Sequence, residues 1–138
     1  MRTVFSGVLP VKALATTSVT QGGGAVTTSA IDCGLFGNNF QSVLIQVYSG
    51  TITDGSFAVT VQECATSGGT YTAVDSSRVQ GALPAFAATD DTVVKYFSVR
   101  PTQRYVQAVI TPTGATTGGP FTVLAVLGNG GSNPPATA

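Results

Sequence analysis

Hydrophobic and polar residues alternate over several short stretches of this chain, which is the pattern of half-buried β-strands. In the clearest stretch, Val43, Ile45 and Val47 fall on one face of the expected strand. Leu44 and Tyr48 fall on its other face, so we expect this strand to be central in its sheet and covered on both sides.

Similar signals recur along the chain, separated by turns rich in Gly, Pro and Asp. The expected strands cover residues 26–31, 42–48, 57–62, 70–74, 92–99, 104–111 and 121–127. No segment has a sustained helical period with caps. The pattern therefore predicts an all-β fold, an antiparallel β-sandwich of the jelly-roll or immunoglobulin-like kind.

The segments between and around these strands are expected to behave differently. Residues 78–89 should form a loop whose Leu83 and Phe86 need cover from elsewhere, and the apolar strand 121–127 should be buried on both faces. Gly22, Gly23 and Gly24 predict a flexible joint.

Three regions are therefore expected. They are an extended arm with a Gly-rich joint over 1–24, a sandwich domain over 25–128 and a flexible tail over 129–138. The arm could pair with a neighbouring molecule or lie across its own domain. The joint predicts that removal of residues 1–20 leaves the body folded but weakens assembly.

Composition narrows the function. The chain has no His and no Trp, 9% charged residues, and six basic against six acidic side chains. Catalysis needs tunable acids, bases or activated nucleophiles, so we do not expect an enzyme. Nucleic acids and anionic membranes are bound by clustered Lys and Arg, and no such cluster exists.

Low charge also bears on association. A net charge of zero with 43% hydrophobic residues favours contact between molecules. We therefore expect much of the surface to be covered by partner chains. The alternative is a monomer kept soluble by its Thr and Ser hydroxyls.

A few acidic residues could carry chemistry. Asp90 and Asp91 could help to hold a hard cation, but neighbours in a strand point to opposite faces, so a solvated strand start is favoured. Asp54 before Gly55 is expected to form a turn. Glu63 should point inward, with Arg100 or Arg104 as its structural partner. No catalytic, cofactor-binding or metal-binding residue is predicted.

Three tyrosines, Tyr71, Tyr96 and Tyr105, could stack on sugars or bases, although packing between strands is favoured. The N-terminus lacks a signal-peptide pattern, so Cys33 and Cys64 are expected in a reducing cytosol as small buried side chains. A disulfide between them would require adjacent strands.

Four segments carry a likeness to a known group of proteins. They are residues 50–63 with the Asp-Gly turn, Ser67-Gly68-Gly69-Thr70-Tyr71-Thr72-Ala73-Val74, residues 95–106 ending in Arg104-Tyr105-Val106, and residues 109–119 ahead of an apolar strand. Together the order and spacing of these segments, over residues 40–128, resemble small virion proteins encoded by tailed bacteriophages and prophages. Cys64 departs from that pattern, since a small polar residue is expected there.

This resemblance implies a structural part of a phage particle, made in the host cytoplasm and located in the virion. The favoured role is a capsid decoration, or cement, protein that binds the major capsid protein and assembles as a homo-oligomer, with a trimer favoured. A neck or tail adaptor or tube protein is the first alternative. A carbohydrate-binding sandwich used in adhesion is the second.

Overall fold

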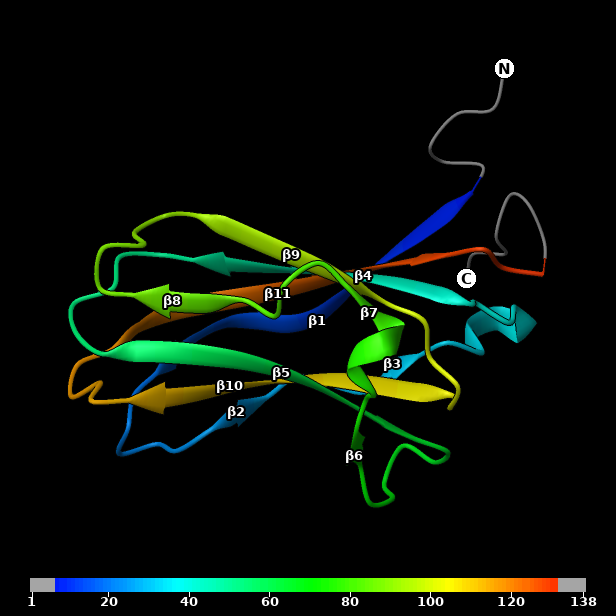
Figure 1. Ribbon diagram of the computed structural model, residues 1–138, viewed down its shortest axis with the longest axis horizontal. Coiled ribbons are helices and arrows are strands. Elements are labelled where there is room, and N and C mark those ends of the chain that lie inside the picture. The colour runs from blue at the N-terminus through cyan, green and yellow to red at the C-terminus, as the bar shows by residue number, and fades with distance from the viewer. Residues whose placement is uncertain (1–6, 132–138) are drawn as a thin grey trace.

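The computed structural model describes residues 7–131, which form two antiparallel sheets stacked as layers (Figure 1). Sheet A contains, in spatial order, β1 (Val8–Val19), β11 (Gly119–Gly128), β4 (Ser42–Ser49), β9 (Val94–Val99) and β7 (Val79–Gln80). Sheet B contains β2 (Val26–Thr27), β10 (Tyr105–Thr113), β5 (Ser56–Cys64) and β6 (Thr72–Ala73), with β3 (Ile31–Asp32) on β10 and β8 (Ala85–Ala87) on β5. The all-β antiparallel sandwich predicted from the alternation is confirmed. The described helical segments are two 3-10 turns, η2 (Leu35–Gly37) and η3 (Ser76–Arg78).

The core lies between the inner faces of the two sheets. Val43, Ile45 and Val47 of β4 are fully buried, as their alternation predicts. The prediction that β4 is covered on both sides is wrong, because Tyr48 is exposed and Leu44 is only partly buried. In β11, likewise, every second residue is fully shielded while the intervening ones are half-buried. Apolar residues on both faces of a strand do not reveal that, within residues 7–131, no third layer covers sheet A.

Three buried phenylalanines pack together between the two sheets, near the end of the sandwich where β5 and β11 begin. The ring centroids of Phe57 and Phe121 are 4.8 Å apart, and those of Phe86 and Phe121 are 5.2 Å apart. Phe86 belongs to β8, so the expected loop over 78–89 in fact contains two short strands, β7 and β8. The Phe86 side chain is buried in the core, whereas the Leu83 side chain is exposed.

Residues 8–19 of the expected arm form strand β1 at the edge of sheet A, the second of the two arrangements expected for the arm. Strand β1 is paired with β11 from Val8–Gly128 to Val19–Gly119, with two irregularities in register. Within it, Ala13 and Val19 are buried in the core. The Gly-rich segment is a tight turn, in which the amide of Gly23 donates to the carbonyl of Thr20 at 3.2 Å. The chain therefore lies across its own domain.

Two other segments differ from their predicted form. The strand expected over 26–31 is divided into β2 and β3, which both pair with β10. Between them, the Thr28 hydroxyl accepts a hydrogen bond from the amide of Ala108 on β10 at 3.0 Å and interrupts the backbone ladder. Of the tail expected over 129–138, residues 132–138 lie outside the described part of the chain.

Candidate docking surface

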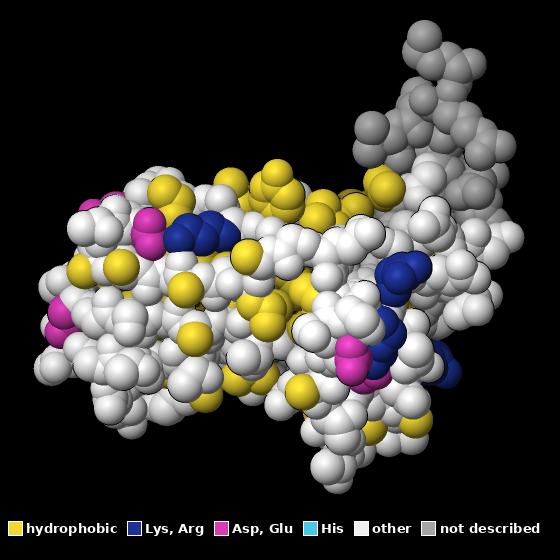
Figure 2. All heavy atoms as spheres, viewed as in Figure 1, with side chains coloured by type: hydrophobic (Ala, Val, Ile, Leu, Met, Phe, Trp, Pro, Cys, Tyr) yellow, Lys and Arg dark blue, Asp and Glu magenta, His cyan; other side chains and the backbone are white. Residues whose placement is uncertain are grey.

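The outer face of sheet A carries the largest exposed hydrophobic side chains that lie close together on one surface of the described protein. Tyr96, Val94 and Tyr48 are 66%, 47% and 37% exposed. The register places Tyr48 beside Val94 and Gln46 beside Tyr96 across β4 and β9. Figure 2 shows hydrophobic side chains gathered along the upper margin of the body, over β9.

The apolar surface continues from β9 and β4 towards the other edge of the sheet. Leu124 lies beside Gln46, and Val126 lies beside Leu44. On β1, Pro10 lies beside Val126. We call this surface the outer face of sheet A; its apolar members are Pro10, Leu44, Tyr48, Val94, Tyr96, Leu124 and Val126.

Polar side chains on this face are paired with one another. The Tyr48 hydroxyl donates to Oε1 of Gln46 at 3.0 Å, and the hydroxyls of Thr16 and Thr122 lie 2.8 Å apart. Covering a polar group is costly when it loses its hydrogen bonds to water, and an existing partner lowers that cost. The face can therefore be buried with little loss of hydrogen bonding.

Charge is nearly absent from this face. Among the outward positions of the four long strands β1, β11, β4 and β9, Lys12 is the charged residue. Elsewhere, acidic and basic side chains lie mainly in mixed groups, as Figure 2 shows. The outer face of sheet B differs in character, since its exposed positions on β5 and β10 carry small or polar residues such as Ala58, Thr60 and Thr111.

The edges of sheet A are less suited to contact than its face. On the β1 edge, Pro10 lacks an amide donor, Lys12 is charged and the register is irregular between Lys12 and Thr17. The carbonyl of Ala13 already accepts a hydrogen bond from the amide of Ser29 at 2.8 Å. These are features that protect an edge strand from pairing with another chain.

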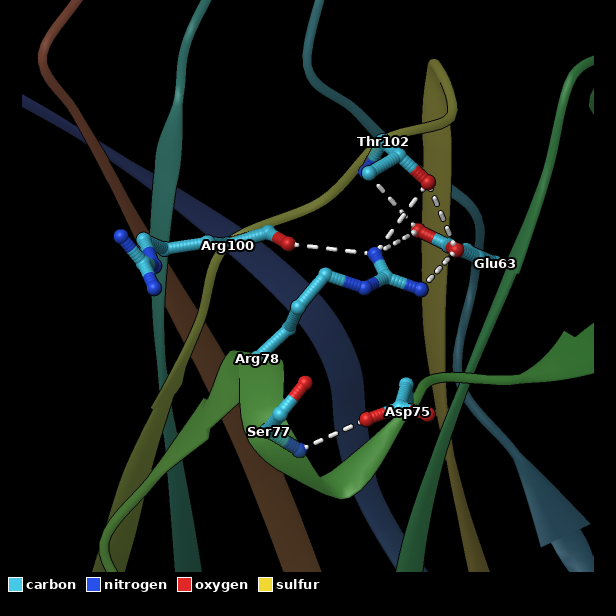
Figure 3. Close-up of polar contacts among 6 residues, drawn as sticks. All are labelled: Glu63, Asp75, Ser77, Arg78, Arg100 and Thr102. Carbon is cyan, nitrogen blue, oxygen red and sulfur yellow. Dashed lines mark hydrogen bonds and ion pairs between the residues drawn. The ribbon is translucent and has the colours of Figure 1, made fainter.

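Glu63 is the buried acid of the structure, and it points inward as the sequence predicts. The prediction that Arg100 or Arg104 is its partner is wrong. Arg78 at the end of η3 holds it instead, with contacts of 2.6 Å and 3.0 Å between the two guanidinium nitrogens and the two carboxylate oxygens. The amide and the hydroxyl of Thr102 each donate to this carboxylate at 3.0 Å (Figure 3). The cluster fastens sheet B to the β9–β10 connection, a structural role.

Hydrogen bonding to Arg78 lowers the pKa of Glu63 to about 2 against the opposing effect of burial, with further lowering from Thr102. The unfolded chain then takes up this proton more readily than the folded one, so stability is lost as the pH falls from about 4.5 towards 2. We expect the loss to reach about 3 kcal/mol. Thermal melts between pH 6 and pH 2, compared with those of Glu63→Gln, would measure it. An identical pH dependence in both proteins would contradict the assignment.

The remaining acids hold loops in place. Asp54 accepts hydrogen bonds from the amides of Thr116, Thr117 and Gly118 at 2.6–3.0 Å. These bonds lower the pKa of Asp54, and the bond from Gly118 has the largest effect. A side chain at Gly118 could not be accommodated, because its Cβ would lie 1.9 Å from the carbonyl oxygen of Val19. Asp54 thus fixes the β10–β11 connection in addition to forming its own turn.

Asp90 and Asp91 serve two different partners. One carboxylate oxygen of Asp90 accepts from the amide of Ala87 at 2.8 Å and from Nζ of Lys95 at 3.1 Å. Asp91 accepts from the amide of Ile52 at 2.7 Å. Within residues 7–131, no group of three or more His, Cys, Asp or Glu side chains could hold a metal ion. Each of the two carboxylates therefore holds a loop in place.

The tyrosines considered as a stacking platform lie on different sheets. Tyr96 is on β9 of sheet A, whereas Tyr105 is on β10 and Tyr71 precedes β6, both of sheet B. Only Tyr96 of these three contributes to the outer face of sheet A, where Tyr48 is its aromatic companion. The sequence offered a signal for this face, since Leu44 and Tyr48 occupy the non-core side of the β4 alternation.

Cys33 and Cys64 are buried free thiols on opposite sides of strand β10. The amide of Cys33 donates to the carbonyl of Arg104, and Cys64 is paired with Tyr105. Two strand spacings, about 10 Å, therefore separate the thiols, which is beyond the reach of a disulfide. The adjacent strands that a disulfide would require are absent from this arrangement.

Burial, followed by the charges of Asp32 and Glu63, raises the pKa of the Cys33 thiol to about 12. Because the thiolate is the reactive form, Cys33 is expected to resist alkylation at pH 8 in the folded protein and to react fully once the protein is unfolded. Mass spectrometry of iodoacetamide-treated protein would measure this. A peptide that contains Cys33 disulfide-bonded to Cys64 would contradict the arrangement.

A cavity of about 650 Å³ opens at the end of the sandwich between η2 and the β9–β10 connection. Polar side chains such as Asn39, Gln103 and Arg104 line it, together with Phe40. Arg104 is engaged with Asp32 through contacts of 2.8 Å and 2.9 Å. Its guanidinium is thus neutralised by a neighbouring acid, and this cavity offers no arrangement of acid, base and nucleophile.

No helix in the described part of the chain is long and apolar enough to span a bilayer.

Comparisons with known proteins identify no family for this chain. No protein-family model matches the chain, and no curated protein matches it. One similar solved structure is described by the words "Bacillus endospore appendages form a novel family of disulfide-linked pili". It shares 17% identity, the match covers 89% of each chain, and the TM-score is 0.49. A likeness at this level says nothing of function.

Proposed function

We propose that this chain is a structural subunit of a tailed-bacteriophage virion, namely a capsid decoration protein that binds the major capsid protein and stabilises the shell. The observation that carries the proposal is the outer face of sheet A, which is apolar, nearly uncharged and exposed. A contiguous exposed apolar surface marks a place of contact with another molecule, which in a decorated shell is either a shell subunit or a further copy of this chain. The resemblance of residues 40–128 to small virion proteins supports the virion as the setting.

The rest of the structure suits a passive, load-bearing role. The acids Asp54, Glu63, Asp90 and Asp91 hold loops and sheets together, so the body is braced at both ends of the sandwich. A braced body transmits force between neighbours without a change of shape. On a shell, each copy adds one modest contact, and many copies together give a large total stabilisation.

The proposal is tested with shells of the phage that encodes this chain, prepared without it. Purified chain is expected to bind these shells to saturation at a fixed ratio to the capsid protein and to raise their melting temperature. An unrelated β-sandwich of similar size is the control and should do neither. Absence of binding to the shells, with binding to isolated necks or tails, would replace the decoration role by the adaptor role.

A further inference from the structure

We propose that the outer face of sheet A is a contact between two copies of this chain, in which the two sheets A stack face to face about a two-fold axis. The inference rests on the proposed function in that both require this face to be covered in the working assembly. It names the occupant of the face, which the proposed function leaves open.

Charge favours a second copy as the occupant. A surface that carries a patch of one sign repels its own copy, whereas a neutral surface is complementary to itself. The outer face of sheet A is neutral over β4, β9 and β11, and Lys12 lies on β1 at its margin. A partner with charges at the contact would leave them desolvated and without counter-charges, which is costly. A second neutral face carries no such penalty.

Shape supports the same occupant. Two sheets pack best when their strands are nearly aligned, about 10 Å apart, with side chains of the two faces interlocked. The two exposed tyrosines of the face, Tyr48 and Tyr96, lie on β4 and β9, whereas β1 and β11 contribute the smaller or aliphatic side chains Pro10, Thr122, Leu124 and Val126. A two-fold axis that lies between the two sheets, parallel to the strands, would place the tyrosines of one copy over the aliphatic side chains on β1 and β11 of its partner.

The size of the face sets the strength of the contact. Four strands about 4.8 Å apart and eight residues of about 3.3 Å each give a footprint of roughly 500 Å². A stable dimer buries about 800 Å² on each partner. The contact is therefore expected to be weak and reversible in dilute solution and to form fully where copies are concentrated. Because a two-fold contact closes on itself, it gives a dimer, in place of the trimer expected from the resemblance.

The test is sedimentation equilibrium of the full chain over a wide range of concentration, without shells. Wild type is expected to pass from monomer to dimer as the concentration rises. Tyr96→Asp puts a charge on the face at a highly exposed position, so we expect folding to be retained and dimerisation to weaken at least about 100-fold. The matched control is Thr60→Asp on the outer face of sheet B, which should dimerise like wild type. Circular dichroism checks that all three are folded.

Several results would overturn the inference. They are a wild type that remains monomeric at every concentration, a trimer, or equal dimerisation of the two aspartate variants. Shell binding separates this failure from that of the proposed function. A monomeric wild type that still saturates shells would remove the dimer alone. A dimer that ignores shells would remove the decoration role alone.

Discussion

A chain that lacks residues 1–20 is expected to lose the native sandwich. Strand β1 covers the whole of β11 on one side, and Ala13 and Val19 are buried in the core. Leu9, Val11 and Leu14 pack against that core. Burial of a side chain of this size contributes about 1.5–3 kcal/mol. Val19 and the partly buried Leu9, Val11 and Leu14 together contribute roughly 5–10 kcal/mol, which is comparable to the whole stability of a typical domain.

Circular dichroism and a proton–nitrogen NMR spectrum of the truncated chain would test this expectation. A milder pair of variants keeps the test informative if the truncated chain precipitates. Val19→Ala is expected to lower the free energy of unfolding by about 2 kcal/mol, whereas Ser18→Ala, at an exposed neighbour in the same strand, should change it by less than about 0.5 kcal/mol. A truncated chain with dispersed, native-like resonances would show that β1 is dispensable after all.

Arg78→Leu is expected to lower the free energy of unfolding by about 3–5 kcal/mol, because it leaves the carboxylate of Glu63 buried without its counter-charge. The bonds from Thr102 remain, so the lower part of this range is favoured. Urea unfolding at pH 7 would measure the effect. The loss should shrink at acidic pH, where Glu63 of the variant can become protonated.

The matched control is Arg100→Leu, which removes a cation from the adjacent connection. The Arg100 guanidinium points away from the cluster in Figure 3, and only its backbone carbonyl accepts a bond from Arg78 there. We expect a change below about 0.5 kcal/mol for this control. Equal losses in the two variants would show that the cluster contributes no specific stability.

Sequence reasoning succeeded where the signal is local. The alternation of β4 is a property of that strand alone, so it correctly predicted that Val43, Ile45 and Val47 share one buried face. It failed where the answer depends on distant parts of the chain. Gly22, Gly23 and Gly24 have the composition of a linker, and only their bonds to residues 20 and 21 make the segment a turn that connects β1 of sheet A to β2 of sheet B.

At the candidate site, too, local features could be predicted from the sequence, and features that depend on distant segments could not. The sequence predicted that Glu63 is inward-facing, since it continues an apolar alternation, but the choice of Arg78 over Arg100 depends on how η3 folds back beside β9. The exposed outer face of sheet A was missed because apolar residues on both sides of β4 and β11 indicate cover without naming its source. The inner face of sheet A is covered by sheet B, whereas Tyr48, Val94 and Tyr96 on its outer face are exposed.

The central claim is that this protein works by being covered, as one of many identical copies in a larger assembly. The most direct measurement is the number of copies of this chain in each purified phage particle, obtained by quantitative mass spectrometry against the major capsid protein. The account predicts on the order of hundreds of copies, in a fixed ratio to the shell subunit. A particle free of this chain, or one that holds it only as a single small ring of about a dozen copies, would contradict the decoration role.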